Sequence, residues 1–298
     1  MRKRVSILPS ILALCLFAQS ANGASGKKDF ILMDTFVRIE IRDELQESRK
    51  EEAINKAFKR MEELSGKFDY FKKESELAKI NGLKKGETLT VSDDMLSILG
   101  FSRKMHDETN GAFDVTVLSS RGPSIWAVNA EEKTISFNED GVKIDLSGVA
   151  KGYIVDEGVK SLRQSGIKKA IVNAGGDMYC AGKARIGIRD PRDKEKIIGF
   201  FDAENTGIAT SGAYERPGHI IDPRTGSRVK ERLKSVTVTA KNCQKADALA
   251  TALFVTDIEK GLSLIESTND AECVIIDEKG ALHVSSGMPQ ITLTNEKR

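Results

Sequence analysis

Apolar and polar positions alternate in some parts of the chain and follow a helical period in others. Residues 30–42 alternate, with Val37, Ile39 and Ile41 separated by charged side chains, and are predicted to form a strand. Helical spacing of apolar residues predicts helices over 48–68, 74–80, 92–110, 246–254 and 258–265. Further strands are expected at 170–173, 184–189, 199–202, 207–210, 235–240, 273–276 and 281–284. Helices and strands interleave without a regular βαβ period or an internal repeat, which favours a single α+β unit with two lobes.

The first 23 residues have the pattern of a removable export signal. A basic start at residues 2–4 precedes a short apolar run at 7–18, and small residues precede a cleavage site after Gly23. We therefore expect a folded domain over residues 24–291, located in the periplasm or otherwise outside the cytoplasm. A disordered polar tail is expected at 292–298. Lipoprotein anchoring at the cysteine inside the apolar run is the less favoured alternative, because a large leucine precedes that cysteine.

Charge and cysteine content exclude several classes of function. The chain carries 46 basic and 44 acidic residues, and loss of the three basic residues of the signal leaves 43 against 44. A near-neutral protein gives no indication of nucleic-acid binding. Cys180, Cys243 and Cys273 are too few for a disulfide scaffold, although they would allow one bridge. The sequence has no zinc-binding spacing, Walker A loop or Gly-x-Ser-x-Gly elbow.

A glycine-containing loop at residues 143–156 (KIDLSGVAKGYIVD) is the first candidate site. An alternating segment leads into Ser147-Gly148 and Lys151-Gly152, and then into an apolar helix-like run. A strand that feeds a small-residue loop and a helix start is a common way to hold a phosphate, because free N–H groups there attract negative charge. Asp145 and Asp156 flank the loop and suggest a metal ion or a ribose nearby. The alternative is a tight strand-to-helix turn with a solvated lysine.

Asp247 and Thr251 form the best local candidate for a metal site. They are four residues apart, so a helix places them on one face, one turn from each other. The small alanines around them would let another group approach closely. An oxygen-only pair suits a hard ion such as Mg2+, which keeps several waters and shares substrate phosphates. The alternative is an acidic residue that stabilises a helix N-terminus beside a packed threonine.

His219 and Asp222 are the candidate general base and its orienting carboxylate. They lie in the polar segment 219–226 (HIIDPRTG), which Pro223 and Gly226 shape into a turn. A histidine with a carboxylate nearby can accept a proton near neutral pH. The alternative is a hairpin turn in which Asp222 caps its own backbone.

Taken together and in this order, these segments make the chain similar to the ApbE family of FAD:protein FMN transferases over roughly residues 31–284. The shared blocks are MDT at 33–35, FDYF at 68–71 with Ser75, Glu76 and Asn81, GAFD at 111–114 with Thr116, IDLSGVAKG at 144–152 with Asp156, NAGGD at 173–177, TSG at 210–212 with Tyr214, residues 219–226 and residues 247–253. The chain departs from the family at Asp34, where glycine is usual, and its segment 115–140 is shorter than in many relatives.

The resemblance implies an α+β unit with mixed and antiparallel sheets, flanking helices and a cleft for FAD. The positions implied to bind FAD are Met33, Phe71, Asn81, Ala112, Phe113, Asp114, Asp145, Lys151 and Ile221. The implied Mg2+ ligands are Gly148 and Ala250, through their carbonyls, together with Asp247 and Thr251.

The family reaction transfers FMN from FAD to a threonine hydroxyl of an acceptor protein and releases AMP. The implied acceptor carries a motif like Asp-x-x-Ser/Thr-Gly-Ala-Thr in a membrane redox pump subunit or an extracytoplasmic flavoprotein reductase, which suggests inner-membrane association. Two alternatives stay open. One is a Mg2+-dependent FAD pyrophosphatase that forms FMN and AMP, with Asn81 tuning between hydrolysis and transfer. The other is a non-catalytic FAD-binding protein.

Overall fold

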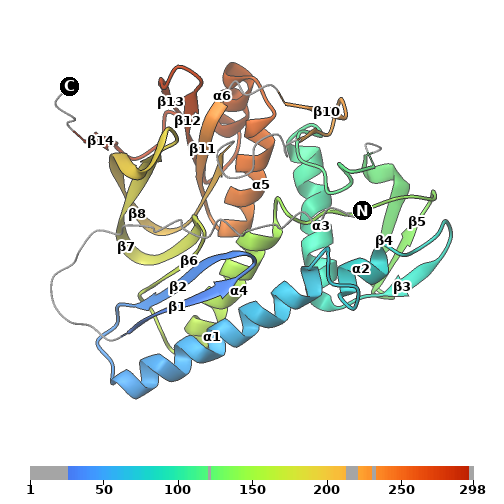
Figure 1. Ribbon diagram of the computed structural model, residues 1–298, viewed down its shortest axis with the longest axis horizontal. Coiled ribbons are helices and arrows are strands. Elements are labelled where there is room, and N and C mark those ends of the chain that lie inside the picture. The colour runs from blue at the N-terminus through green and yellow to red at the C-terminus, as the bar shows by residue number, and fades with distance from the viewer. Residues whose placement is uncertain (1–25, 120–121, 213–220, 230–232, 295–298) are drawn as a thin grey trace, which may run out of the picture.

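The computed structural model describes residues 26–119, 122–212, 221–229 and 233–294, arranged in two lobes (Figure 1). In these residues the largest sheet has nine antiparallel strands, in the order β1-β2-β6-β7-β8-β11-β12-β13, with β14 added beside β8. The strands are β1 Lys27–Leu32, β2 Thr35–Ile41, β6 Ala170–Ala174, β7 Asp177–Asp190, β8 Asp193–Gly212, β11 Leu233–Ala240, β12 Ala271–Asp277, β13 Leu282–Val284 and β14 Thr292–Leu293.

Three helices, α1 Glu47–Phe68, α4 Ala150–Gln164 and α5 Cys243–Phe254, cover one face of this sheet, and α6 Ile258–Glu266 packs beside β12. The sheet separates two hydrophobic cores, as the neighbouring residues Ile171 and Val172 of β6 show by pointing into different ones. The larger core lies under the helices and continues into the second lobe. The smaller core lies on the opposite face of the sheet. Side chains of the long strands β7 and β8 form most of it, together with side chains of β12.

The second lobe contains α2 Glu76–Ile80, α3 Asp93–Glu108 and a small sheet of β3 Thr88–Thr90, β5 Thr134–Phe137 and β4 Trp126–Asn129, entered through a 3-10 turn at Pro123–Ile125. A two-stranded ribbon, β9 Ile221–Asp222 and β10 Ser227–Arg228, stands apart from both sheets. The α1 helix runs from the β1–β2 end of the large sheet to this lobe (Figure 1). The α+β class and the predicted helices are therefore confirmed, with polar N-caps at Ser75, Ser92 and Asn242.

A cluster of charged side chains joins α1 of the sheet lobe to α3 and α4. Arg60 donates to Glu157 at 2.8 Å and also pairs with Asp94, and Lys67 reaches Asp94 at 2.8 Å. Burial opposes ionisation of Asp94, but the hydrogen bonds from Arg60 and Lys67 outweigh it and lower its pKa to about 2. The cluster ties the middle of α4 to α1 and, through Asp94, to α3 of the second lobe.

The single strand expected at residues 30–42 is a hairpin. Met33 and Asp34 both have positive φ, at 54° and 56°, and form the two-residue turn between β1 and β2. A turn of two residues preserves the alternation of apolar and polar positions, so the pattern alone did not reveal it. Asp34, noted above as a departure from an expected glycine, adopts the left-handed conformation that glycine accepts at lower cost.

Three other expectations about strands are wrong. The short strands expected between residues 184 and 210 are parts of two long strands, β7 and β8. The alternating residues 142–146 form no regular strand, and the side-chain amide of Asn81 binds the backbone of Ile144 instead. Thr292 and Leu293, expected in a disordered tail, pair with Phe200 and Gly199 of β8.

The remaining chain-level expectations concern cysteines and the membrane. Cys180, Cys243 and Cys273 are buried and unbridged. Within the described residues, no helix has the length and apolar character needed to cross a membrane.

Candidate active site

The start of α4 and the helix α5 lie against each other in a regular antiparallel register. The Asp156 carboxylate accepts the N–H groups of Cys243 and Gln244, both at 2.9 Å. One turn earlier in α4, the Gly152 N–H donates to Asp247 at 3.0 Å. One turn earlier again, a Cβ on Gly148 would lie 3.1 Å from the Thr251 hydroxyl. Steps of four residues on both segments thus bring the predicted metal residues Gly148, Asp247 and Thr251 together.

Gly152 makes this register possible. A Cβ at this position would lie 2.5 Å from the carbonyl oxygen of Cys243 and 2.6 Å from Cα of Gln244. Both are backbone atoms of α5, which cannot move aside as a side chain can. The glycine in the Lys151-Gly152 pair therefore serves helix packing, a role that a phosphate-loop interpretation of the sequence did not consider.

Asp247 is a buried carboxylate in a negative environment. Its residue is only 5% exposed, and burial, followed by the nearby charge of Asp177, raises its pKa to about 8. Asp177 ends the NAGGD turn and is paired with Lys151. Burial likewise raises the pKa of Asp156 to about 7, against the opposing effect of its two backbone donors. A site with this excess of buried carboxylate is electrostatically suited to a cation.

The donor set at this position fits a hard cation such as Mg2+. Asp247 and Thr251 supply a carboxylate and a hydroxyl, and Gly148 and Ala250 can supply only backbone carbonyls. The Ala250 carbonyl lies within α5, where it accepts one helical hydrogen bond and keeps a second lone pair. In the described part of the chain, no three His, Cys, Asp or Glu side chains group closely enough to hold a metal. A metal here would therefore depend on mixed backbone and side-chain oxygens, which suit Mg2+.

The GAFD block lies directly beside the metal candidates. Phe113 is buried, and its ring edge lies 3.4 Å from a Cβ position on Gly148, so it is a core residue rather than an open stacking platform. Ala112 is buried as well. The next residue, Asp114, accepts from the backbone N–H and the hydroxyl of Thr116, at 2.7 and 2.6 Å. Its other oxygen lies 3.3 Å from Nδ1 of His106, a residue to which the sequence pattern had assigned no role.

Asn81 and Asp145 hold the loop that precedes α4. The Asn81 amide donates to the Ile144 carbonyl at 2.9 Å and accepts the Ile144 N–H at 2.7 Å. The Asp145 N–H donates to the carbonyl of Val115, and its carboxylate accepts the N–H of Ser147 at 2.8 Å. Asn81 is thus a positioning residue for this loop, and the loop is tied to the GAFD block by a main-chain hydrogen bond.

The other two expected FAD contacts from the first half of the chain differ in exposure. Met33 lies in the β1–β2 turn and packs partly against the large core. Phe71 is 87% exposed and meets Tyr70 edge to face, with ring centres 5.3 Å apart. An apolar ring this exposed is available to a ligand or a partner.

The segment that bears the candidate base is only partly described. His219 lies outside the described residues, so its contact with Asp222 stays a prediction. Ile221 and Asp222 form β9, and Asp222 is held by two hydrogen bonds from the Arg224 guanidinium, both at 2.9 Å. Burial opposes ionisation of Asp222, and the bonds from Arg224 outweigh it, so its pKa is below the usual value. Arg224 also donates to the Val255 carbonyl at 2.6 Å, which ties the segment to the end of α5.

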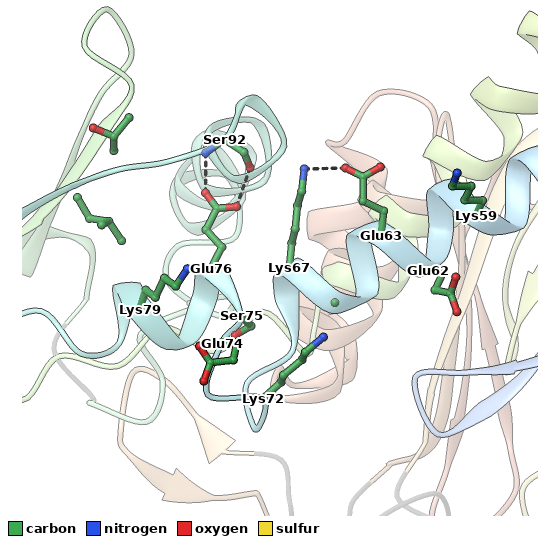
Figure 2. Close-up of a pocket in the computed structure, with 13 residues that line it drawn as sticks. Lys59, Glu62, Glu63, Lys67, Lys72, Glu74, Ser75, Glu76, Lys79 and Ser92 are labelled. Carbon is green, nitrogen blue, oxygen red and sulfur yellow. Dashed lines mark hydrogen bonds and ion pairs between the residues drawn. The ribbon is translucent and has the colours of Figure 1, made fainter.

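A cleft of about 690 Å3 opens elsewhere, between the end of α1, α2 and the residues before α3 (Figure 2). None of the expected site residues lines it. Lys67 pairs with Glu63 at 3.0 Å, and Glu76 accepts from the backbone and hydroxyl of Ser92. Its lysines and glutamates are equal in number, so the cleft carries no excess of positive charge.

The fold and the site together define an α+β protein in which a buried carboxylate and a hydroxyl of α5 lie against the start of α4. The model of the ApbE family matches residues 33–133 and 118–275, which is most of the chain. The chain belongs to the ApbE family.

Relatives and solved structures agree with this membership. The chain is 30% identical over 287 residues to the FAD:protein FMN transferase of Haemophilus influenzae, covering 79% of this chain and 82% of that protein. It is 29% identical over 256 residues to the protein of the same name from Vibrio cholerae, covering 72% and 77%. Among solved structures, the ApbE protein of Thermotoga maritima superposes with a TM-score of 0.77 at 28% identity, over 87% of this chain and 96% of that one. The flavin transferase ApbE of Vibrio cholerae gives 0.74 at 28% identity, over 87% and 97%.

Proposed function

We propose that this protein is a Mg2+-dependent FAD:protein FMN transferase that attaches FMN to a threonine hydroxyl of an acceptor protein and releases AMP. The observation that carries the proposal is the register of α4 on α5. It brings Gly148, Asp247 and Thr251 together beside Phe113 of the GAFD block. Relatives over most of the chain are named for this transfer.

The reaction needs a base and a place for developing charge. The threonine oxygen forms a bond to the FMN phosphorus, the bridging P–O bond of the pyrophosphate breaks, and AMP leaves with the bonding electrons. The threonine proton passes to a base, because a neutral hydroxyl is a poor nucleophile. We assign this role to His219. The contacts of Arg224 with Asp222 and with Val255 hold residues 222–224, which follow His219 closely in the sequence, against the end of α5.

The chain's own residues bind and position the phosphates. Asp247, Thr251 and the carbonyls of Gly148 and Ala250 would hold Mg2+, which when bound neutralises charge on the pyrophosphate. Lys151 adds a cation at the start of α4, held in place by Asp177. The buried position of Asp247 excludes water from its carboxylate and favours a bound cation over a free charge there.

The partners and the location are part of the same proposal. We assign the protein to the periplasm, where its acceptor would carry a motif like Asp-x-x-Ser/Thr-Gly-Ala-Thr in a redox pump subunit or a flavoprotein reductase. Association with the inner membrane would follow from the location of such acceptors.

Mass spectrometry of an acceptor domain incubated with the protein, FAD and Mg2+ tests the proposal. A mass increase of one FMN phosphoester on threonine, with AMP in the supernatant, supports transfer. Free FMN and AMP without modified acceptor would instead establish FAD pyrophosphatase activity. Retention of intact FAD over hours, with no AMP, would establish a binding protein.

Two variants with matched controls assign the roles. Asp247→Ala should abolish Mg2+-dependent transfer, whereas Glu259→Ala, an exposed carboxylate of α6, should not. Full transfer by the Asp247 variant would refute the metal assignment. His219→Ala should bind FAD and transfer FMN slowly, and His283→Ala should transfer normally. An unchanged rate in the His219 variant would remove it as the base.

A further inference from the structure

Asp177 begins β7 at the end of a tight hairpin turn. The two turn residues, Gly175 and Gly176, have φ of 68° and 111°, and Ala174 and Asp177 face each other as the last pair of β6 and β7. The Gly176 N–H donates to the side-chain oxygen of Asn173 at 3.0 Å. Asp177 therefore stands on a closely constrained backbone, and its side chain is only 2% exposed.

The same turn packs against the β1–β2 turn, which carries Met33. The Gly175 N–H donates to the carbonyl of Phe36 at 3.0 Å. A Cβ on Gly175 would overlap the Thr35 hydroxyl and lie 3.1 Å from the Thr35 Cβ, so this close approach needs a glycine. The β1–β2 turn, and with it the implied FAD contact Met33, is thus held beside Asp177.

The charged partner of Asp177 is Lys151, in the first turn of α4. A cation is unfavourable at this place, because the N-terminus of a helix carries a partial positive charge. The first turn of α4 contains no acidic residue, and Val149 at the N-cap makes no side-chain cap hydrogen bond. Helix stability therefore does not account for a lysine at this position.

The ion pair restrains a lysine that would otherwise turn toward solvent. The Lys151 side chain is 30% exposed and has a flexible four-carbon chain, whereas the Asp177 carboxylate is buried. Oδ2 of Asp177, the atom that faces the lysine, has no hydrogen-bond donor among the other described residues. Separation of the pair would leave this buried charge uncompensated, so the carboxylate holds the ammonium group close.

We propose that Asp177 is a positioning residue that strengthens FAD binding by fixing Lys151 where it meets the pyrophosphate. This inference rests on the proposed function, in which Lys151 acts on the FAD phosphates. The expected effect is opposite in sign to that of charge alone. Asp177 and the pyrophosphate are both negative, so removal of the Asp177 charge would by itself strengthen FAD binding. Loss of the positioning contact weakens it instead.

Equilibrium binding of FAD, followed by flavin fluorescence at saturating Mg2+, tests the proposal in a double-mutant cycle. Lys151→Met should raise the dissociation constant by about tenfold to hundredfold, the effect of losing one contact to a charged group. Asp177→Asn, which keeps the shape of the side chain, should raise it by about tenfold. The double variant should bind FAD as Lys151→Met does, because Asp177 acts through the lysine.

Asp190→Asn is the matched control. Asp190 lies at the other end of β7, is buried, and pairs with Arg192 at 2.8 Å. Its replacement removes a buried, paired carboxylate from the same strand and should leave FAD binding unchanged.

The comparisons separate positioning from a general structural role. Unchanged or tighter FAD binding by Asp177→Asn overturns the inference, and so does wild-type affinity of Lys151→Met. Weaker binding by the double variant than by Lys151→Met also overturns it, because a merely structural residue would matter in both backgrounds. That comparison contains no unpaired lysine, so it decides the question even where Asp177→Asn alone does not fold. Failure of the wild type to bind FAD at all overturns the proposed function and this inference with it.

Discussion

Replacement of Gly152 by alanine should separate α4 from α5 and damage stability and ligand binding together. The added Cβ would lie 2.5 Å from a backbone oxygen of α5, whereas ordinary contact begins at 3.4 Å. The helices must therefore part by about 0.9 Å at this point. Overpacking of this kind costs about 1–3 kcal/mol. Weakening of the bond between the Gly152 N–H and the buried Asp247 adds about 1–3 kcal/mol.

Urea denaturation measures the first effect, and Mg2+ and FAD titrations measure the second. Gly152→Ala should lower the free energy of unfolding by about 2–6 kcal/mol and weaken Mg2+ binding, because Gly148, Asp247 and Thr251 depend on the same register. Gly158→Ala, one helix turn and a half further along α4, is the matched control. Its Cβ would meet the thioether of Met61 at 2.8 Å, which can rotate aside.

A second control should change stability in the opposite direction. Gly100 lies within α3 with no atom within 4 Å of its Cβ position, so Gly100→Ala should stabilise by up to about 1 kcal/mol. Equal free energies of unfolding for the Gly152→Ala and Gly158→Ala variants would refute the reasoning. That result would mean that the α5 backbone moves aside at no greater cost than the Met61 side chain.

Three further predictions concern the same region. Metal-free protein should lose stability from pH 5 to pH 8. In the folded protein the pKa values of Asp156 and Asp247 are about 7 and about 8, so both carboxyls keep their protons over much of this range. In the unfolded chain the carboxyl pKa is near 3.8, and the same protons have been released. Each group lowers the free energy of unfolding by about 1.4 kcal/mol per pH unit between its two pKa values, and urea titrations of Asp156→Asn should show one such contribution fewer. Asn81→Ala leaves the N–H and carbonyl of Ile144 without their partner and should cost about 2–4 kcal/mol in the same assay, while Asn81→Asp, which keeps the acceptor, should cost less. Arg224→Met should slow FMN transfer by about tenfold while lowering the free energy of unfolding by less than about 1 kcal/mol. The reason is that the Asp222–Arg224 pair is partly exposed and serves mainly to orient its segment. Transfer at the wild-type rate in this variant would contradict the prediction.

Local pattern predicted the helices well because their apolar stripes and caps are properties of adjacent residues. Ser92 caps α3 by accepting the Met95 N–H, and the helix ends just before Asn110 and Gly111, as the sequence indicated. Strand boundaries were less predictable. The turn at Met33 and Asp34 preserves the alternation on both sides, and β7 and β8 continue through bulges that interrupt the pattern.

The sequence placed the candidate residues on a helix and on a loop, but it did not predict their contacts. Asp247 and Thr251 could be assigned to one helix face from their spacing, and Gly148 to a loop at a helix start. The tertiary structure showed which side chains pair: Lys151 with Asp177, Asp222 with Arg224, and Asp114 with His106. His106 and Asp114 are eight residues apart across a helix end, a spacing that has no local signature.

The sequence by itself determined the α+β class, the order of the helices and the chemical types at the site, because these depend on neighbouring side chains and on blocks of residues shared with a family. Only the tertiary structure decided that Gly152 is a packing glycine and that Asp156 of α4 belongs to the same helix–helix register as Asp247 and Thr251 of α5. The physical reason is that burial and pairing involve residues far apart in the chain, such as Gly152 and Asp247, which are 95 positions apart. Their energies depend on how closely two helices approach, which no local pattern encodes.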